Sequence, residues 1–416
     1  MIQAIRSWSL LTLVALLLAV SNVSVGAQAH DSASGDVTAA APAGNVLSDS
    51  VDFLPASTLK AAPASLPAIT HQLTVPLNQR VLSYIELFQG RMRSFIETGM
   101  KNGSKYLPMI QRIFTAQGLP PELAYVPLVE SAFRPEAISN ASAKGVWQFM
   151  KGTAVENGLR NDWYVDERSN PEKATVAAAN YLRSLADTFN GDWQLALASY
   201  NSGPGRVQQA IKRVGVANFW SLAAKPTALP RETREYVPMI LAAIVIARNP
   251  AQYGFNFESE EAPAFETVTL PRAVALKKVA EWSGSTVETL RALNPELRRP
   301  VTPIKDADYA LRVPVGTSIE IARRMDEAGG QDLVSVRRYT VKGGETLPAV
   351  ARKLHISRAD LAEANGLGQT ASLTPGQELT VPADVPFVPY SDPQRSKAAS
   401  KTPSKKTAST RKASSN

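Results

Sequence analysis

The chain has 416 residues, a formal net charge of +8, no cysteine and three histidines, His30, His71 and His355. At about 100 to 200 residues per domain, this length indicates two or three domains, each able to bury a core. The missing cysteines exclude disulfides, Cys-ligated metals and lipidation at a cysteine. The three histidines leave no Ser-His-Asp constellation and no histidine metal cluster, so we expect neither a metal nor a cofactor.

Residues 1–29 have the composition of a secretory signal peptide. Arg6 precedes a mostly apolar run over 10–20, and small residues follow at Ala27 and Ala29. The run is about half as long as the roughly 20 residues that a transmembrane helix needs, which favours cleavage over an uncleaved anchor. We therefore predict an exported protein.

Residues 30–75 are rich in Ala, Ser, Pro and Asp, which is typical of a linker. Apolar residues then recur at helical spacing, and no segment over 76–257 alternates like a strand. We predict a mainly α-helical domain there. A Pro- and Glu-rich passage over 258–266 separates it from a C-terminal part of different texture.

The first domain places a glutamate on the apolar side of a predicted helix. Pro120 and Pro121 suit the first turn, and the face that passes through Leu123 and Val126 reaches Glu130 near the C-terminal end. Burial and the negative end of the helix dipole would both raise the pKa of this carboxyl. A carboxyl that is protonated near neutral pH can donate a proton to a leaving oxygen.

Four motifs begin at this residue and follow one another along the chain. They are ESAFRPEAIS (130–139), AKGVWQFM (143–150), ASYNSGPGRV (198–207) and TREYV (233–237). In this order they resemble the soluble-lytic-transglycosylase family over roughly residues 75–255. The resemblance implies a lysozyme-like helical catalytic domain that cleaves the β-1,4 bond between N-acetylmuramic acid and N-acetylglucosamine in peptidoglycan strands.

The reaction implied by the resemblance needs one carboxyl. Glu130 acts as general acid and then as base, and the muramyl C6 hydroxyl closes on C1 to form a 1,6-anhydromuramyl end. Ordinary glycoside hydrolysis uses two carboxyls instead. A goose-type lysozyme, which hydrolyses the same bond, is the alternative. Its second carboxyl would come from four candidates: Glu136, Asp162, Asp166 and Asp192.

The second motif supplies candidate substrate contacts. Gln148 and Met150 offer amide and soft apolar contacts to an N-acetyl sugar, and Gly145 would let the chain pass close to it. Trp147 suits either the cleft or ordinary core packing. The resemblance further implies that Ser131 orients the lactyl or peptide group of the substrate.

The third and fourth motifs add two tyrosines and an asparagine. Tyr200 and Asn201 end an apolar-stepped helix, and Tyr200 could stack on a sugar or form a hydrogen bond near the carboxyl. The resemblance places Tyr236 close to the catalytic glutamate. Core packing is the alternative for both tyrosines.

The C-terminal part contains an internal repeat. The matching segments are Thr289–Asn294 with Asp360–Asn365, and Ala310–Pro314 with Glu378–Pro382. Residues 337–384 resemble a LysM domain, a small β-α-α-β unit whose helices Thr346 and Ser357 can cap, and Pro348 falls in a first helical turn. This unit is expected to contact N-acetylglucosamine-containing glycan.

The earlier copy, over 267–315, keeps the helical core but lacks an equivalent Gly-Gly start and Pro-Gly turn. We interpret it as a degenerate LysM-like module, and the lost turn residues favour a structural spacer over a glycan-binding role.

The basic tail, residues 388–416, carries seven basic side chains against one aspartate, which is +6 of the net charge. In an exported protein such a tail would contact an anionic wall or membrane surface, or would only aid solubility. Nucleic acid is not an expected partner. We expect a periplasmic protein associated with the cell wall, with at most a peripheral membrane contact. A non-catalytic LysM wall-binding protein is the second alternative.

Overall fold

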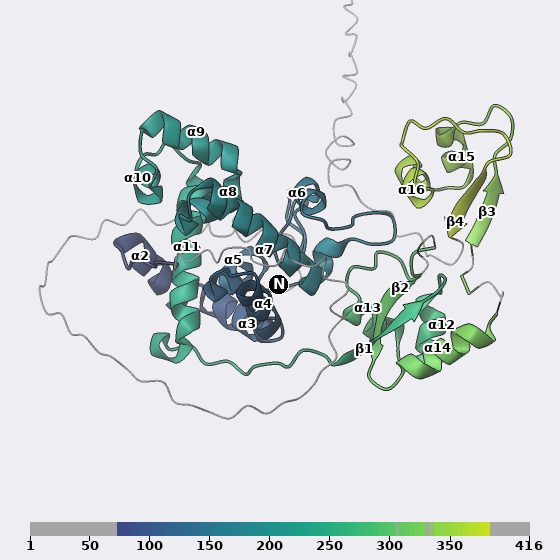
Figure 1. Ribbon diagram of the computed structural model, residues 1–416, viewed down its shortest axis with the longest axis horizontal. Helices are drawn as coiled ribbons and strands as arrows, with labels where there is room; N and C mark the ends of the chain where they lie inside the picture. The colour runs from purple at the N-terminus through teal and green to yellow at the C-terminus, as the bar shows by residue number, and fades with distance from the viewer. Residues whose placement is uncertain (1–72, 305, 307, 330–332, 335, 383–416) are drawn as a thin grey trace, which may run out of the picture.

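The computed structural model describes residues 73–304, 306, 308–329, 333–334 and 336–382 (Figure 1). The predicted signal peptide, nearly all of the predicted linker and the basic tail lie outside this part of the chain. The helical part begins at residue 79. Its elements, with η for 3₁₀ helices, are α2 (Gln79–Gln89), α3 (Arg93–Ser104), α4 (Leu107–Ala116), η1 (Pro121–Tyr125), α5 (Val126–Ser131), α6 (Lys151–Glu156), η2 (Glu167–Ser169), α7 (Pro171–Thr188), α8 (Trp193–Ser202), α9 (Pro204–Val214), α10 (Phe219–Ala224), α11 (Arg231–Arg248) and η3 (Pro250–Tyr253).

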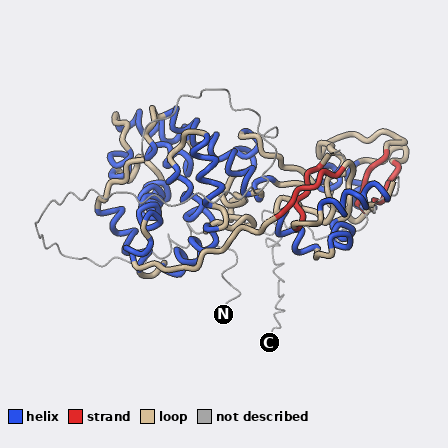
Figure 2. The backbone as a smooth tube through the Cα atoms, turned by 60° about the horizontal axis from the view of Figure 1, so that its bottom comes forward, coloured by secondary structure: helices blue, strands red, loops and turns tan. Residues whose placement is uncertain are grey.

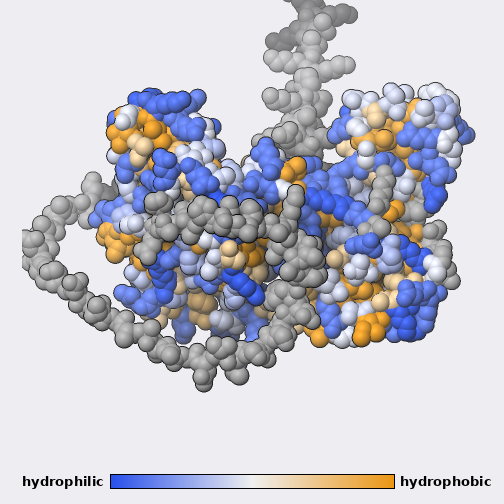
Figure 3. Space-filling view, in the orientation of Figure 1, coloured by the Kyte–Doolittle hydropathy of each residue, from blue (hydrophilic) through white to orange (hydrophobic). Residues whose placement is uncertain are grey.

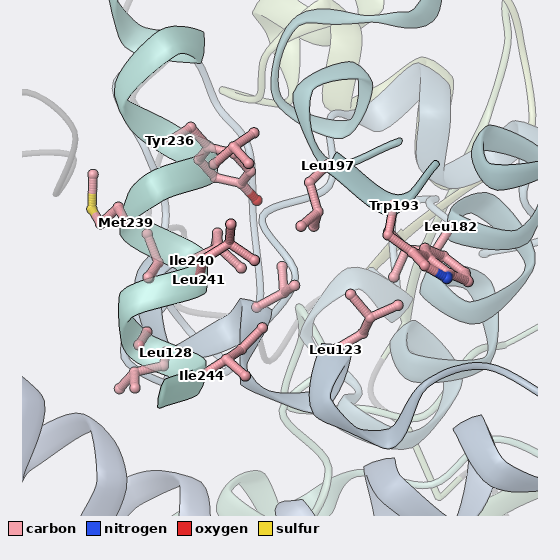
Figure 4. Close-up of a cluster of buried hydrophobic side chains, with 14 of the residues drawn as sticks. Leu123, Leu128, Leu182, Trp193, Leu197, Tyr236, Met239, Ile240, Leu241 and Ile244 are labelled. Atoms are coloured by element: carbon pink, nitrogen blue, oxygen red, sulfur yellow. The ribbon is translucent and has the colours of Figure 1, made fainter. Parts of the chain in front are cut away.

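Helix α11 runs through the core of the helical part. Its residues from Tyr236 to Ile244 are all buried. A helix segment that is apolar on every side is stable only when other elements surround it. It contacts α2, η1, α5 and α8. Figure 4 shows Tyr236 and Ile244 of α11 in the same apolar cluster as Leu123 and Leu197.

The chain around Glu130 differs from the single helix that the sequence predicts. A 3₁₀ helix (η1) comes first, and the α-helix α5 starts only at Val126. The reason is Pro127, which has no N–H to continue a preceding helix and suits a new first turn. The predicted place of Glu130 near a helix C-terminus is confirmed, since α5 ends at Ser131.

Two glycines of α3 lie close to α5 and to the residues that follow it. A Cβ at Gly99 would lie 2.3 Å from a methyl carbon of Leu128, and one at Gly103 would lie 2.7 Å from the ring of Phe133. Real Cβ atoms do not approach that closely, so an added Cβ at either position would force Leu128 or Phe133 to shift. The close contact fixes the segment that carries Glu130.

Each C-terminal module has an antiparallel pair of strands and two short helices between them. The first module consists of β1 (Phe265–Leu270), α12 (Leu276–Ser283), α13 (Val287–Leu293), β2 (Tyr309–Pro314) and α14 (Ser318–Glu327); the second consists of β3 (Val336–Thr340), α15 (Leu347–Lys353), α16 (Arg358–Ala364) and β4 (Glu378–Pro382). The predicted fold class is confirmed: a mainly helical part is followed by small β-α-α-β modules. Figure 2 shows their strands at one end of the molecule.

The repeated asparagines have the same role in both modules. Asn294 donates to the carbonyls of Leu290 and Arg312 and accepts from the Arg312 N–H. Asn365 makes the same three bonds with Leu361 and Thr380. Each side chain therefore ties the end of the second helix to the final strand, which explains why the repeat keeps this residue.

Helix α14 extends the first module beyond the predicted end at residue 315. Its Ile321 and Met325 are buried in the core of that module. In the second module Ser357 caps α16 as predicted, whereas the Thr346 side chain at the start of α15 makes no capping bond. Pro348 lies in the first turn of α15, as predicted.

Apolar residues on the face shown in Figure 3 form scattered patches rather than one continuous surface. Among the described residues, no helix combines the length and the apolar character that a membrane span requires.

Candidate active site

The partly exposed Glu130 meets Tyr236 of α11. The Tyr236 hydroxyl donates a 2.6 Å hydrogen bond to Oε1 of Glu130, and the tyrosine is fully buried. Burial raises the pKa of Glu130 to about 7, an effect that the Tyr236 hydrogen bond reduces and the nearby Glu232 carboxylate increases. The site thus holds a carboxyl that is substantially protonated near neutral pH.

Tyr200 of α8 also interacts electrostatically with this carboxyl. Burial, with a contribution from the charge of Glu130, raises the pKa of Tyr200 well above its usual value. Its hydroxyl donates to the Trp147 carbonyl at 2.8 Å, so the polar group is used to hold the second motif. Its ring lies beside Phe149 and Tyr181.

Asn201 connects the third motif to the start of α11. Its Oδ1 accepts a 2.7 Å hydrogen bond from Thr233, and its Nδ2 donates to Glu232 at 3.3 Å. Glu232 is the carboxylate that interacts with Glu130, and it was not among the sequence candidates. Its spacing of four from Tyr236, which puts both on one face of a helix, is the signal that could have found it.

Ser131 and Gln148 use their polar groups inside the protein. Ser131 is 1% exposed, and its hydroxyl donates to the Val146 carbonyl at 2.8 Å. The Gln148 amide donates to the carbonyls of Ala137, at 3.1 Å, and Gly145, at 2.8 Å. Both side chains therefore shape the second motif.

Three exposed apolar side chains belong to the same region. Met150, which precedes α6, is 48% exposed, and Ile138 and Val155 are 63% and 53% exposed. They lie within or next to the part of the chain that carries the first two motifs. Of the second-motif candidates, Met150 is the one that the structure leaves open to solvent in this way.

Two other residues of the second motif have internal roles. Trp147 is fully buried, donates to Thr175 Oγ1 at 3.0 Å and stacks on Phe114, which assigns it to the core. A Cβ on Gly145 would lie 1.7 Å from the Arg168 carbonyl oxygen. The group that approaches Gly145 on its Cβ side is therefore this backbone carbonyl, and the expectation that Gly145 makes room for a sugar stays a prediction.

Most of the candidates for a second carboxyl already have local roles. Asp162 accepts from the backbone N–H groups of Tyr164 and Val165, and Asp192 caps α8. Asp166 binds Lys144 and Arg168, and Glu136 is exposed on a turn. Glu232 is the additional carboxylate for which an interaction with Glu130 is found.

Comparisons with known proteins follow this division of the chain. Profiles described as Transglycosylase SLT domain, as Lytic transglycosylase MltD, LysM-like domain, and as LysM domain match residues 109–222, 264–328 and 339–382. Membrane-bound lytic murein transglycosylase D of Escherichia coli K12 is 33% identical over 327 residues, which cover 75% of this chain and 71% of that protein. The chain belongs to the lytic murein transglycosylases.

Two shorter similarities are to proteins that are also named transglycosylases. Peptidoglycan transglycosylase gp16 of Escherichia phage T7 is 41% identical over 106 residues, 25% of this transglycosylase and 8% of that protein. The solved structure of lytic transglycosylase Slt from Pseudomonas aeruginosa has a TM-score of 0.31 and 28% identity over 35% of this chain and 24% of that one.

Family membership establishes the general activity. This protein is an enzyme, a lytic transglycosylase that acts on peptidoglycan, and its SLT and LysM domains are peptidoglycan-binding domains. The alternative of a non-catalytic wall-binding protein is therefore wrong.

Proposed function

We propose that Glu130 is the general acid, and then the base, in cleavage of the bond between N-acetylmuramic acid and N-acetylglucosamine. The observation that carries the proposal is the Glu130 carboxyl, whose pKa is raised to about 7 and whose Oε1 is held by Tyr236. A general acid works best when its pKa lies near the working pH.

The chemistry balances with this carboxyl alone. Glu130 gives its proton to the glycosidic oxygen, and the C1–O bond breaks to leave an oxocarbenium-like muramyl centre. The muramyl C6 hydroxyl oxygen bonds to C1, and its proton returns to Glu130. Tyr236 stabilises the carboxylate between these steps, because its hydroxyl is already bonded to Oε1. The product is a 1,6-anhydromuramyl end, and no water is consumed.

We assign the remaining site residues to two roles. Met150 contacts the sugar directly, since its exposed side chain offers soft apolar surface. The other residues stabilise the backbone segments around Glu130 through the internal hydrogen bonds described above. These residues are Ser131, Gln148, Tyr200 and Asn201.

Removing the Tyr236 hydroxyl should shift the pH dependence of catalysis upward. Because the Tyr236 hydrogen bond lowers the pKa of Glu130, that pKa should rise above about 7 in Tyr236→Phe. The acid must be protonated, so activity is lost as the pH rises through this pKa, and the basic limb of the kcat profile should move to higher pH. The Tyr84→Phe variant is the control, since it removes a tyrosine bond to Glu235, elsewhere on α11. A limb that stays in place in Tyr236→Phe would contradict the assignment.

Digestion of sacculi in oxygen-18 water tests the internal nucleophile. We expect unlabelled, non-reducing muramyl ends about 18 mass units lighter than hydrolysed ends, because ring closure loses the water that hydrolysis adds. Mass spectrometry of the released muropeptides measures both properties. Labelled, reducing ends would show lysozyme-like hydrolysis and would make Glu232 the first candidate for the second carboxyl.

We further propose that residues 339–382 bind N-acetylglucosamine-containing glycan, that the enzyme works in the cell envelope, and that the basic tail contacts anionic surfaces there. Two truncations separate these contributions. A chain that ends after Pro382 loses only the tail, whereas one that ends after Gly330 also loses the LysM domain. In pull-down with sacculi we expect a small loss for the first and a several-fold loss for the second. Equal binding by both would refute the LysM role.

A further inference from the structure

The first C-terminal module forms a backbone contact with a loop of the helical part, residues 160–170. The Asp166 N–H donates to the Glu296 carbonyl, and the Arg298 N–H donates to the Tyr164 carbonyl, both at 2.8 Å. Val165 and Leu297 form the antiparallel bridge between these bonds. The two segments are thus paired as strands are, although they belong to different parts of the chain.

Side chains make this contact extensive. Trp163, Tyr164 and Val165 are buried in the hydrophobic core of the first module, not in that of the helical part. At the edge of the contact, Asn170 donates to Oε1 of Glu296 at 2.9 Å. A further ion pair joins Arg312 of β2 to Glu172 of α7 at 2.8 Å. Buried apolar area combined with backbone pairing holds the module firmly against the helical part (Figure 1).

The same loop holds the second motif. Arg168 donates to the carbonyls of Ser142, at 2.9 Å, and Phe149, at 3.0 Å, which are the two ends of the segment 142–149. Asp166 binds both Arg168 and Lys144. Burial alone would raise the pKa of Asp166, but the hydrogen bonds and charges of Arg168 and Lys144 outweigh it and lower the pKa to about 2. This buried ion cluster therefore stays charged and paired.

The segment 142–149 in turn contacts the residues around Glu130. Its Val146 carbonyl accepts from Ser131, the neighbour of Glu130 in the chain, and its Trp147 carbonyl accepts from Tyr200. A continuous path of hydrogen bonds therefore runs from Glu296 of the first module, through the loop 160–170, to one wall of the active site.

We propose that the first module, residues 264–328, stabilises the active site as a brace and does not bind glycan. Asp166 and Arg168 are positioning residues, because they connect the loop that contacts this module to the segment 142–149. The inference rests on the proposed function in one respect: cleavage by Glu130 is its readout. Residues 296–298 of the module pair with the catalytic part, which is consistent with the lost turn residues in this copy of the repeat.

A matched pair of substitutions at Glu296 tests the brace in the full-length enzyme. Glu296→Ala keeps the backbone bond to Asp166 but removes the buried side chain that accepts from Asn170 at the end of the loop 160–170. We expect the loosened loop to lower kcat about tenfold with little change in KM, because small misplacements at a distance reduce the rate of the chemical step. Glu296→Gln keeps an Oε1 acceptor, and Oε2 has no hydrogen-bond partner among the described residues, so this variant should retain the wild-type kcat.

The pH profile distinguishes a brace from a general loss of stability. A loosened wall admits water to Glu130, so its pKa should fall and the basic limb should move to lower pH in Glu296→Ala. The other ionisable groups that face Glu130 are unchanged: Tyr236 and Glu232 of α11, and Tyr200 of α8. Mere destabilisation would reduce the amount of active enzyme without moving the limb.

A charge exchange supplies an independent test if Glu296→Ala does not fold. Glu172→Arg and Arg312→Glu should each lower kcat, and the double variant should recover it because the pair is restored in reverse. If the variants fold and keep the wild-type kcat, and the basic limb of the kcat profile stays at the same pH, the brace proposal is refuted. Loss of sacculus binding at constant kcat would also overturn it, in favour of a glycan-binding module. Glu130→Gln run in parallel separates these outcomes from failure of the proposed function, because that variant would then cleave sacculi at the wild-type rate.

Discussion

The Glu130→Gln variant should lose about 10²- to 10⁴-fold of its kcat for glycan cleavage, the range that general acid–base catalysis contributes. An amide has no proton to give to the glycosidic oxygen, whichever molecule attacks C1 afterwards. The glutamine has nearly the same shape and can still accept the Tyr236 hydrogen bond, so the fold should survive. Release of muropeptides from sacculi measures the rate, and circular dichroism checks the fold.

Glu235→Gln is the matched control for this substitution. Glu235 is also a glutamate that accepts a tyrosine hydroxyl, that of Tyr84, and it is partly exposed. Its amide should leave kcat nearly unchanged, because Glu235 is not among the groups that interact with Glu130. Comparable losses in the two variants would show that a tyrosine-bonded glutamate on these helices supports the fold and not the chemistry.

The sequence predicts the centre of this site better than its walls. Glu130 and Tyr236 could be paired because the resemblance to the soluble-lytic-transglycosylase family implies that they lie close together, even though 106 positions separate them. Pro127 interrupts the helix before Glu130, a local effect that the apolar spacing hides. Glu232 lacks a distinctive motif position, and its interaction depends on how α11 crosses α5.

The contact between the loop 160–170 and the first module could not be predicted from local patterns. Trp163 and Val165 look like core residues of the helical part, and only the folded chain shows that they belong to the core of the module. The bond between Asp166 and Glu296 joins backbone groups, which every residue carries. The contact at Gly145 was missed for the same reason, since the carbonyl that approaches it comes from a distant segment.

Gly145→Ala should destabilise the protein strongly, and Gly158→Ala should do so only mildly. Both glycines have left-handed backbones, with φ of 85° and 87°, so an alanine at either position costs about 1–2 kcal/mol. The added Cβ at Gly158 would meet no atom within 4 Å, whereas at Gly145 it would lie 1.7 Å from the Arg168 carbonyl oxygen. Relieving that overlap should add about 1–3 kcal/mol or more to the loss in the free energy of unfolding.

The position of Gly145 adds a catalytic consequence that Gly158 lacks. Moving the Arg168 carbonyl would pull its guanidinium away from Ser142 and Phe149, and with it the wall that contacts Ser131 and Tyr200. Urea unfolding measures the stability of each variant, and kcat is taken under conditions where both are folded. We expect Gly158→Ala to keep kcat and Gly145→Ala to lose most of it. Equal unfolding free energies for the two variants would mean that the loop moves aside at little cost and does not fix this wall.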